Sequence, residues 1–253
     1  MLPYNDIDRS IALLDQYKDK LACIVLDLMP HRVGLNPANK DYVIALRDWC
    51  SDNGVLLVMD EVITFRSEFG GLQEQYGITP DLTAMGKMIG GGFPIGAVAG
   101  RDEVMDVLNP RSSRYLFPHS GTYSANPVST SAGLAAMKKF DRAEVARLNA
   151  LADRAKSGIE QAIKETGVIA SVTGAGSMFR VHMKSQAPTN FREAYLEPEE
   201  NKRLTMLLDH LFENGIVMIN SCSAALSTPM TETEIDLLVD ALRSGFEKLV
   251  AAS

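Results

Sequence analysis

The sequence predicts an α/β protein with a mostly parallel sheet and flanking helices. Two strand-like apolar runs, ACIVLDLM (22–29) and VLLVMDEV (55–62), enclose a helical pattern, YVIALRDWCSDNG (42–54). Strand, helix and strand joined by short links build parallel sheets, and nearly unbroken apolar strands are typical of sheets covered on both faces. The shorter segments DLTAMG (81–86) and IGAVAG (95–100) are expected to add further strands.

The second half of the chain has a different pattern. Long helical stretches cover residues 128–140 and 143–166, and residues 168–183 alternate like a pair of strands around two glycines. Two more helices, near 198–214 and 231–249, are expected to flank a short strand GIVMI (215–219). We therefore expect a large domain over residues 1–139 and a smaller C-terminal α+β domain over residues 140–253.

Composition and charge argue for a small-molecule partner. The 253 residues carry a net charge of -7, and the basic residues are scattered, so no nucleic-acid or anionic-membrane footprint is expected. The N-terminus, MLPYNDID, lacks a hydrophobic signal core, which favours a cytoplasmic protein. The three cysteines and four histidines are dispersed, so neither a disulfide framework nor a metal site is expected.

Asp60 is the first candidate site residue, because it follows an apolar strand at the end where ligands bind in open α/β sheets. Strand alternation places Asp60 and Val62 on one face and Glu61 on the other. A carboxylate in this position costs several kcal/mol unless a cation compensates for its desolvation. A salt bridge to a nearby basic residue, or a helix N-cap, is an equally good interpretation of Asp60 alone.

Lys87 is the second candidate, in the segment DLTAMGKMIGGGFPIGAVAG (81–100). Glycine lets a backbone approach a ligand closely, so the dense glycines after Lys87 suggest a crowded binding site. The segment is neither a P-loop nor a dinucleotide fingerprint, because Asp81 and Ile95 stand where those motifs need glycine. A single lysine is more often a solvated surface residue.

Asp60 and Lys87 together fit the two charges that pyridoxal phosphate requires. The cofactor needs an amine for a Schiff base and a carboxylate that keeps its ring nitrogen protonated. Lys87 would carry the cofactor and then move a proton between the substrate carbon and the cofactor. The pair therefore suggests a pyridoxal-phosphate enzyme.

Three longer segments resemble a known family. The segments VMDEVITFRSEFGGLQEQYGITPDLTAMGKMIGGGFPIGAVAG, HSGTYSANPVSTSAGLAAM and GSMFRVHM resemble the class III, fold type I, pyridoxal-phosphate aminotransferases. The most similar branch looks like the glutamate-1-semialdehyde 2,1-aminomutase-like group, and the resemblance covers nearly the whole chain. It implies a partial fold type I architecture, with the cofactor bound by the large domain over residues 1–139.

The resemblance also implies roles for five residues. The carboxylate on the pyridine nitrogen falls on Asp60, the Schiff-base lysine on Lys87, and the residue packed on one ring face on Val62. The Gly-Thr pair that reaches the cofactor phosphate, usually across a dimer interface, falls on Gly121 and Thr122. A homodimer is therefore expected.

The chain departs from the family in two places. The family's Glu-Pro strand end, followed by Gly-Asn near the phenolic oxygen, reads DLMPHR (27–32) here, which leaves His31 and Arg32 as candidates for that contact. Family members also have a long N-terminal portion, with a phosphate-binding loop and a ring-stacking aromatic, that is not expected in this chain. The result would be either a compact working enzyme or a scaffold that holds the cofactor weakly.

The expected function is amino-group transfer between an amine or amino acid and a keto acid, aldehyde or ketone, by a ping-pong mechanism. An aminomutase is the alternative within the enzyme class, and a noncatalytic family remnant acting as a binding module is the alternative outside it. Arg66, Arg180 and Arg203 are each able to pair with a substrate carboxylate, but each is equally compatible with a surface position, so none is assigned.

Overall fold

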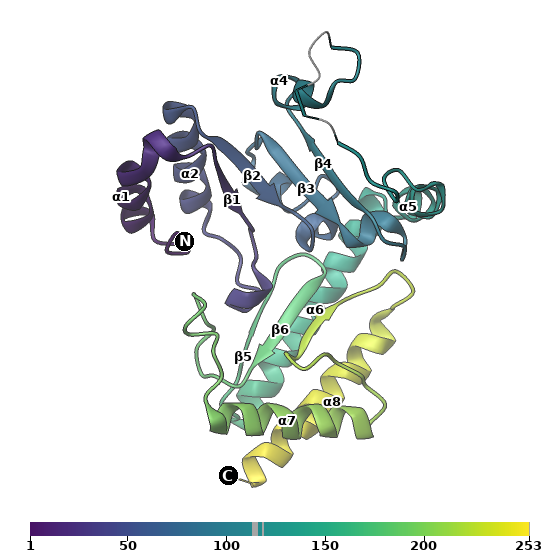
Figure 1. Ribbon diagram of the computed structural model, residues 1–253. Helices are drawn as coiled ribbons and strands as arrows, with labels where there is room; N and C mark the ends of the chain where they lie inside the picture. Colours follow the sequence, from purple (N-terminus) through teal and green to yellow (C-terminus); the bar gives the residue numbers. More distant parts are fainter. Residues whose placement is uncertain (113–115, 118, 253) are drawn as a thin grey trace. The chain divides into compact units, whose positions relative to one another are not determined.

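The computed structural model describes residues 1–112, 116–117 and 119–252, and the chain divides into two compact units (Figure 1). The first unit contains Met1–Leu28 and Ala38–Arg142, and the second contains Met29–Pro37 and Ala143–Ser253. The segment 29–37 thus belongs to the second unit, although both of its flanks belong to the first. Compactness does not show which unit binds a ligand, so the division into a cofactor-binding domain (1–139) and a small domain (140–253) stays a prediction.

The first unit contains a four-stranded sheet in the order β1-β2-β3-β4. The strands are β1 (Cys23–Leu26), β2 (Leu56–Asp60), β3 (Leu82–Gly86) and β4 (Gly96–Gly100). The first three run parallel to one another, and β4 pairs with β3 in the antiparallel direction. The expected α/β fold with a mostly parallel sheet is confirmed.

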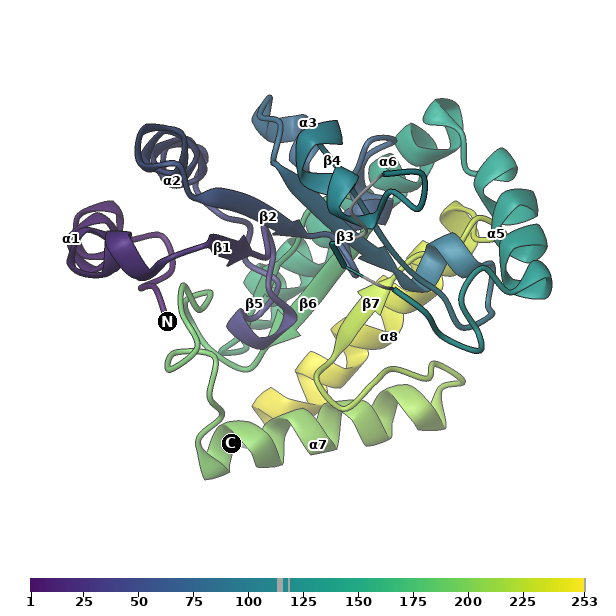
Figure 2. The ribbon, with the colours of Figure 1, turned by 45° about the horizontal axis from the view of Figure 1, so that its top comes forward.

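Helices of the first unit pack through apolar faces that the sequence pattern indicates. In α2 (Lys40–Asn53) the buried residues are Tyr42, Val43, Leu46, Trp49 and Cys50, at helical spacing. Helix α1 (Ile7–Tyr17) lies beside α2 (Figure 2), and the Trp49 indole donates a hydrogen bond of 2.8 Å to Asp15 of α1. The remaining helices are α3 (Gln73–Tyr76), α4 (Asp102–Met105) and α5 (Pro127–Lys139), with short 3-10 turns η1 (Lys18–Lys20), η3 (Thr64–Ser67), η4 (Lys87–Gly90) and η5 (Asp106–Leu108).

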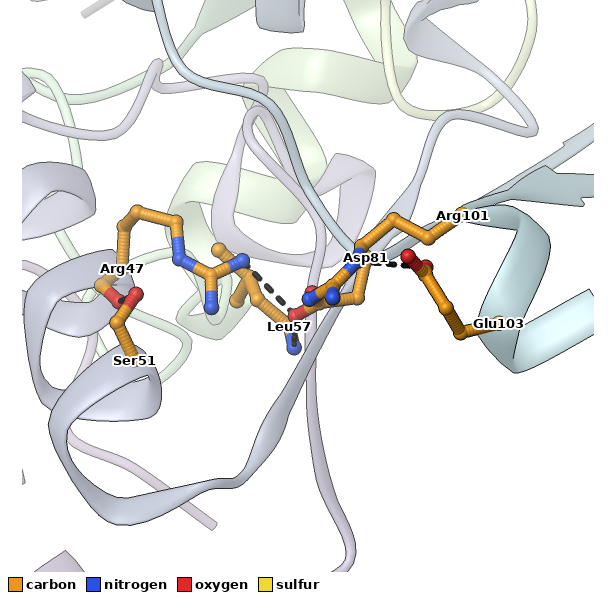
Figure 3. A network of polar contacts seen from close by, with 6 residues as sticks. All are labelled: Arg47, Ser51, Leu57, Asp81, Arg101 and Glu103. Carbon is orange, nitrogen blue, oxygen red and sulfur yellow. Dashed lines mark hydrogen bonds and ion pairs between the residues drawn. The ribbon is translucent and has the colours of Figure 1, made fainter.

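A buried carboxylate, Asp81, joins four segments of the first unit immediately before β3 (Figure 3). Its Oδ2 accepts hydrogen bonds from the Leu57 N–H of β2 at 2.7 Å and from Arg47 of α2 at 2.9 Å. Its Oδ1 accepts one from Arg101, the residue after β4, at 2.8 Å. Burial alone would raise the pKa of Asp81, but the Leu57 N–H, Arg101 and Arg47 outweigh burial and lower this pKa.

The second unit combines a three-stranded antiparallel sheet, in the order β5-β6-β7, with three long helices. The strands are β5 (Ser171–Thr173), β6 (Met178–His182) and β7 (Ser223–Ala225), and the helices are α6 (Arg142–Thr166), α7 (Pro198–Glu213) and α8 (Glu232–Ala251). The expected strand at residues 215–219 was wrong, because the third strand is Ser223–Ala225. Val217 and Ile219 are 80% and 54% exposed, so β-forming side chains occur here without a sheet neighbour to bury them.

The segment 29–37, which includes η2 (His31–Val33), is tied to the second unit's sheet by polar contacts with buried residues. The Gly34 carbonyl accepts a hydrogen bond from Thr173 of β5 at 2.5 Å and lies 3.1 Å from His182 Nε2 of β6. Gly34 has φ +96°, and a β-carbon there would lie 2.9 Å from the His182 ring, so both backbone conformation and close approach require glycine. Burial, assisted by the charge of Arg180, lowers the pKa of His182 to about 4.

None of the helices formed by the described residues has the length and apolar character needed to cross a membrane.

We predict that Asp81→Asn lowers the free energy of unfolding by about 3 kcal/mol, because it leaves two guanidinium groups without their shared carboxylate. Urea denaturation measures this change. The matched control is Glu103→Gln, which removes an ion pair to the same Arg101 but at a side chain that is 75% exposed. The control should change stability by less than about 0.5 kcal/mol, and equal effects of the two variants would contradict the role of Asp81.

We further predict that His182 makes the fold acid-sensitive between pH 6.5 and pH 4. Since the pKa of His182 is lower in the folded state, only the unfolded chain binds this proton in that interval, and stability falls as the pH falls. The loss should approach about 3 kcal/mol near pH 4, from a difference of about 2.5 pKa units. Urea denaturation at pH 7, 5.5 and 4.5 should show a smaller loss for His182→Gln, and parallel pH curves would refute the prediction.

Candidate active site

Asp60 and Lys87 lie at the carboxyl ends of neighbouring parallel strands. Strand β2 ends at Asp60, and β3 ends at Gly86, immediately before Lys87. Asp60 is opposite Ala84 in the β2-β3 register, and the Glu61 N–H donates to the Ala84 carbonyl at 2.9 Å. The register therefore brings the two sequence candidates to the same end of the sheet, which is where open α/β sheets bind ligands.

Asp60 is half-buried, and its carboxylate lacks an ion-pair partner among the residues that the structure describes. Its Oδ1 accepts a hydrogen bond from the Val62 N–H at 3.1 Å. The salt bridge to a nearby arginine or lysine, one of the two ordinary interpretations of this acid, is thus not observed in the described part of the chain. A half-buried carboxylate without a cation is suited to receive a positively charged ligand.

Val62 lies beside Gly86. The strand alternation expected from the sequence does not explain this position. Strand β2 ends at Asp60, so the two-residue period does not extend to Val62. The chain turns there instead, and Val62 Cγ1 lies 3.4 Å from the position that a β-carbon on Gly86 would occupy. The turn places an apolar side chain beside the residue that precedes Lys87.

Lys87 begins the turn η4 with a backbone φ of +51°, in the left-handed region that residues with a β-carbon rarely adopt. Its side chain is exposed and makes no ion pair or hydrogen bond with the other described residues. Such a conformation costs of order 1 kcal/mol and persists only where surrounding contacts impose it. The amine is therefore accessible on a backbone that packing holds in place.

Gly91, the residue after η4, and Gly133 of α5 supply that packing. A β-carbon on Gly133 of α5 would lie 2.1 Å from the Ile89 carbonyl oxygen, and one on Gly91 would lie 2.4 Å from the Ala132 carbonyl oxygen. The dense glycines after Lys87 were expected to crowd a ligand. At Gly91, the close neighbour is instead the backbone of α5, so this glycine positions the lysine turn against a helix.

Gly121 and Thr122 lie in an exposed turn that leads into α5. The Gly121 carbonyl accepts a hydrogen bond from the Ser124 N–H at 3.0 Å, and Asn126 caps α5 by accepting from the N–H groups of Val128 and Ser129. Neither Gly121 nor Thr122 is hydrogen bonded to Asp60, Val62 or Lys87. Their role toward a phosphate stays a prediction.

Glu61 is a residue of this region whose importance the sequence did not reveal. It is fully buried, its Oε2 accepts from the Thr64 hydroxyl, and its Oε1 accepts from the Gln73 N–H at 2.7 Å. Burial raises the pKa of Glu61 despite the hydrogen bonds from Thr64, Gln73 and Leu72, and the adjacent Asp60 charge adds to the increase. Glu61 thus anchors the loop that follows Asp60. In the sequence, Glu61 was notable only as the neighbour of Asp60 that was expected to point to the opposite face of the strand.

The family model for class III aminotransferases matches residues 4–244. The chain belongs to the class III aminotransferases. It is 35% identical over 236 residues to a glutamate-1-semialdehyde 2,1-aminomutase from Chloroherpeton thalassium, covering 92% of this chain and 54% of that protein.

Solved structures of transaminases agree with the fold. An omega-transaminase from Sphaerobacter thermophilus superimposes with a TM-score of 0.95 at 41% identity, covering 98% of this chain and 57% of that one. A transaminase with bound pyridoxal phosphate gives a TM-score of 0.89 at 36% identity, covering 99% and 57%. The fold type I architecture is confirmed, and the chain spans just over half the length of these relatives.

We predict that Gly133→Ala destabilises the fold by about 1 to 3 kcal/mol, because its methyl group would collide with the backbone of the lysine turn. Gly96→Ala is the matched control, since a β-carbon on Gly96 meets nothing within 4 Å. Urea denaturation of both variants should show a change within about 0.5 kcal/mol for the control. Equal stability of the two variants would contradict the close packing of α5 on η4.

Proposed function

We propose that the protein is a pyridoxal-phosphate-dependent aminotransferase that moves an amino group between an amine or amino acid and a keto acid, aldehyde or ketone. The observation that carries the proposal is the half-buried, unpaired carboxylate of Asp60 at the same sheet end as the accessible amine of Lys87. Membership of the class III aminotransferases and the likeness to a transaminase with bound pyridoxal phosphate support it.

The two candidate residues fit this cofactor chemically. When bound, pyridoxal phosphate withdraws electrons from the substrate carbon through its protonated ring. Asp60 would hold the proton on the ring nitrogen. Its carboxylate is available for this contact because it forms no ion pair with the described residues. The Lys87 amine would hold the cofactor covalently and, when released, move a proton to or from the substrate carbon.

Three further residues would orient the cofactor. Val62 would pack on one face of the ring, and Gly121 and Thr122 would donate an N–H and a hydroxyl to the phosphate of a partner subunit's site. This arrangement requires a homodimer, so the dimer is part of the proposal. The assignment of residues 1–139 as the cofactor-binding domain depends on the same five residues.

An aminomutase is the second candidate, because the Chloroherpeton thalassium relative carries that name. The two activities use the same lysine and acid, and they differ in whether the keto product leaves before the amine returns. Adding an amine donor with pyruvate or 2-oxoglutarate and analysing the products separates them. A released keto product supports the aminotransferase, and an isomerised substrate without release supports the aminomutase.

A noncatalytic binding module is the candidate outside the enzyme class. The chain spans 54% of the aminomutase relative, and Val25 of β1 and Val98 of β4, at the two edges of the sheet, are 65% and 54% exposed. Exposed edge strands favour association with another polypeptide. A purified protein that shows no cofactor absorbance at saturating pyridoxal phosphate would favour this candidate over the enzyme.

We predict that wild-type protein mixed with pyridoxal phosphate shows the visible absorption band of the lysine-bound cofactor, and that Lys87→Ala abolishes it. Lys138→Ala, at an exposed lysine of α5, is the control and should retain the band. Asp60→Asn should keep the band but reduce turnover at least about 100-fold, since a neutral amide does not hold the ring charge. A band that persists in Lys87→Ala would refute the assignment of the lysine.

A further inference from the structure

The carboxylate of Glu61 holds together the loop that follows Asp60. It is fully buried, and it accepts hydrogen bonds from the Thr64 hydroxyl and from the Gln73 N–H, the latter at 2.7 Å. Thr64 is three residues further along the chain and Gln73 is twelve, so one side chain closes the whole loop. Buried donors that lose their acceptor are not compensated by water. The loop is therefore fixed from its interior.

Gly71 shows how closely the loop packs on this carboxylate. Its φ is +82°, in the left-handed region that favours glycine. A β-carbon there would lie 2.9 Å from Oε1 of Glu61 and 3.1 Å from Cδ2 of Phe65. Phe65 also donates its N–H to the Glu61 carbonyl at 3.0 Å. The loop thus encloses both the backbone and the side chain of Glu61, and close packing prevents the carboxylate from rotating away.

A second set of contacts leads from the same loop to strand β3, which lies beside β2 (Figure 1). The Gln73 side chain accepts a hydrogen bond from the Thr83 hydroxyl of β3 at 3.0 Å and donates one to the Gly70 carbonyl at 3.1 Å. Glu61 donates its own N–H to the Ala84 carbonyl of β3 at 2.9 Å. These bonds, together with the chain itself, form a closed circuit that joins the loop to β3 at two adjacent residues.

The circuit borders both candidate catalytic residues. Asp60 directly precedes Glu61, and Lys87 follows Ala84 by three residues, immediately after β3. Asp81 joins β2 to the start of β3, and the circuit supplies the corresponding connection at the end where the candidate site lies. The spacing between the Asp60 carboxylate and the Lys87 amine therefore depends on contacts that neither residue makes itself.

We propose that Glu61 is a positioning residue, whose carboxylate holds Asp60 and Lys87 at the spacing that the transfer reaction requires. It acts through the loop on the Asp60 side and through Thr83 on the Lys87 side. The inference rests on the proposed function for the reaction that is served, while the hydrogen bonds lie within the first unit and need no ligand. Because a misplacement of about 1 Å can lower turnover roughly 100-fold, such an acid controls the rate although its carboxylate faces the loop interior.

The first test measures amide hydrogen exchange by NMR in the protein without added cofactor. Glu61→Leu retains a side chain of similar size that accepts no hydrogen bond. The Gln73 amide should exchange about 10- to 100-fold faster, the usual effect of removing a charged acceptor. The Val62 amide, which donates to Asp60 at 3.1 Å, should also exchange faster. An unchanged Val62 amide would overturn the proposal.

The Leu57 amide is the internal reference, because its hydrogen bond lies at the other end of β2. Its exchange rate should stay the same in Glu61→Leu. Equal acceleration at Leu57 and Val62 would mean that the substitution loosens the whole unit, and it would overturn the local role. Glu68→Leu is the matched control, since Glu68 accepts an exposed hydrogen bond of 2.6 Å in the same loop. This variant should keep the wild-type rates at all of these amides.

Glu61→Gln separates hydrogen bonding from charge. Glutamine has nearly the shape of glutamate, and its carbonyl accepts from the Gln73 N–H while its amide group donates to Thr64. The variant should therefore keep exchange rates near those of wild type at Gln73 and Val62. If Glu61→Gln behaves like Glu61→Leu, the charge matters rather than the hydrogen bonds, and the positioning role is overturned.

The second test measures turnover of the holoprotein. Glu61→Leu should lower kcat about 10- to 100-fold and leave the KM for the amine donor unchanged, because positioning acts on the reacting groups and not on the affinity for the donor. Glu61→Gln should restore most of the rate. Both variants should keep the absorption band of the lysine-bound cofactor, since Lys87 is intact. A wild-type kcat in Glu61→Leu would overturn the proposal.

Thr83→Val keeps the proposal testable if Glu61→Leu does not fold. It removes the hydroxyl bond to Gln73 and leaves a buried side chain of nearly the same volume. We expect kcat to fall about 3- to 10-fold at an unchanged KM, and an unchanged kcat would overturn the connection to Lys87. A wild type with neither the cofactor band nor turnover would overturn the proposed function instead. The exchange rates without cofactor would still decide whether Glu61 holds the site.

Discussion

The carboxylate of Asp81 is the interaction on which the geometry of the first unit depends. It stands immediately before β3 and binds the backbone of β2, a guanidinium of α2 and the guanidinium that follows β4. Both neighbours of β3 are thereby fixed at one end of the strand. A slip of register would separate a buried carboxylate from its donors, which costs more than an ordinary sheet contact. The same register places Asp60 opposite Ala84 at the other end, three residues before Lys87.

The charged side chains that stabilise the fold differ from the candidate functional ones in whether other residues of the protein compensate for their charge. Asp81 and Glu61 are buried, and their donors satisfy both carboxylate oxygens. Asp60 is only half-buried, and it has no partner of opposite charge in the described part of the chain. Proteins rarely retain such groups unless a ligand supplies the missing charge. The free carboxylate of Asp60 is the group whose charge a cofactor would complete under the proposed function.

Local pattern was sufficient to predict the strands of the first sheet, the helices α2, α5, α6, α7 and α8, and the β5-β6 pair, because periodicity and turn residues act within about ten residues. It failed at residues 215–219, where β-forming side chains lack a neighbouring strand. Asp60 and Lys87 were predicted as candidates from their residue types and their positions in a pattern. The burial of Glu61 and the contact of Gly91 with α5 were not, since each depends on chain segments 12 or more residues away.

The segment 29–37 has a practical consequence for dissecting this molecule. The chain leaves the first unit after Leu28, contributes the Gly34 carbonyl to Thr173 and His182, and returns at Ala38. A fragment cut at residue 142 would possess every strand of the second sheet yet lack the acceptor for two of its interior polar side chains. Expressing the C-terminal half by itself would therefore not reproduce its native core, and a minimal version would need this nine-residue excursion grafted onto it.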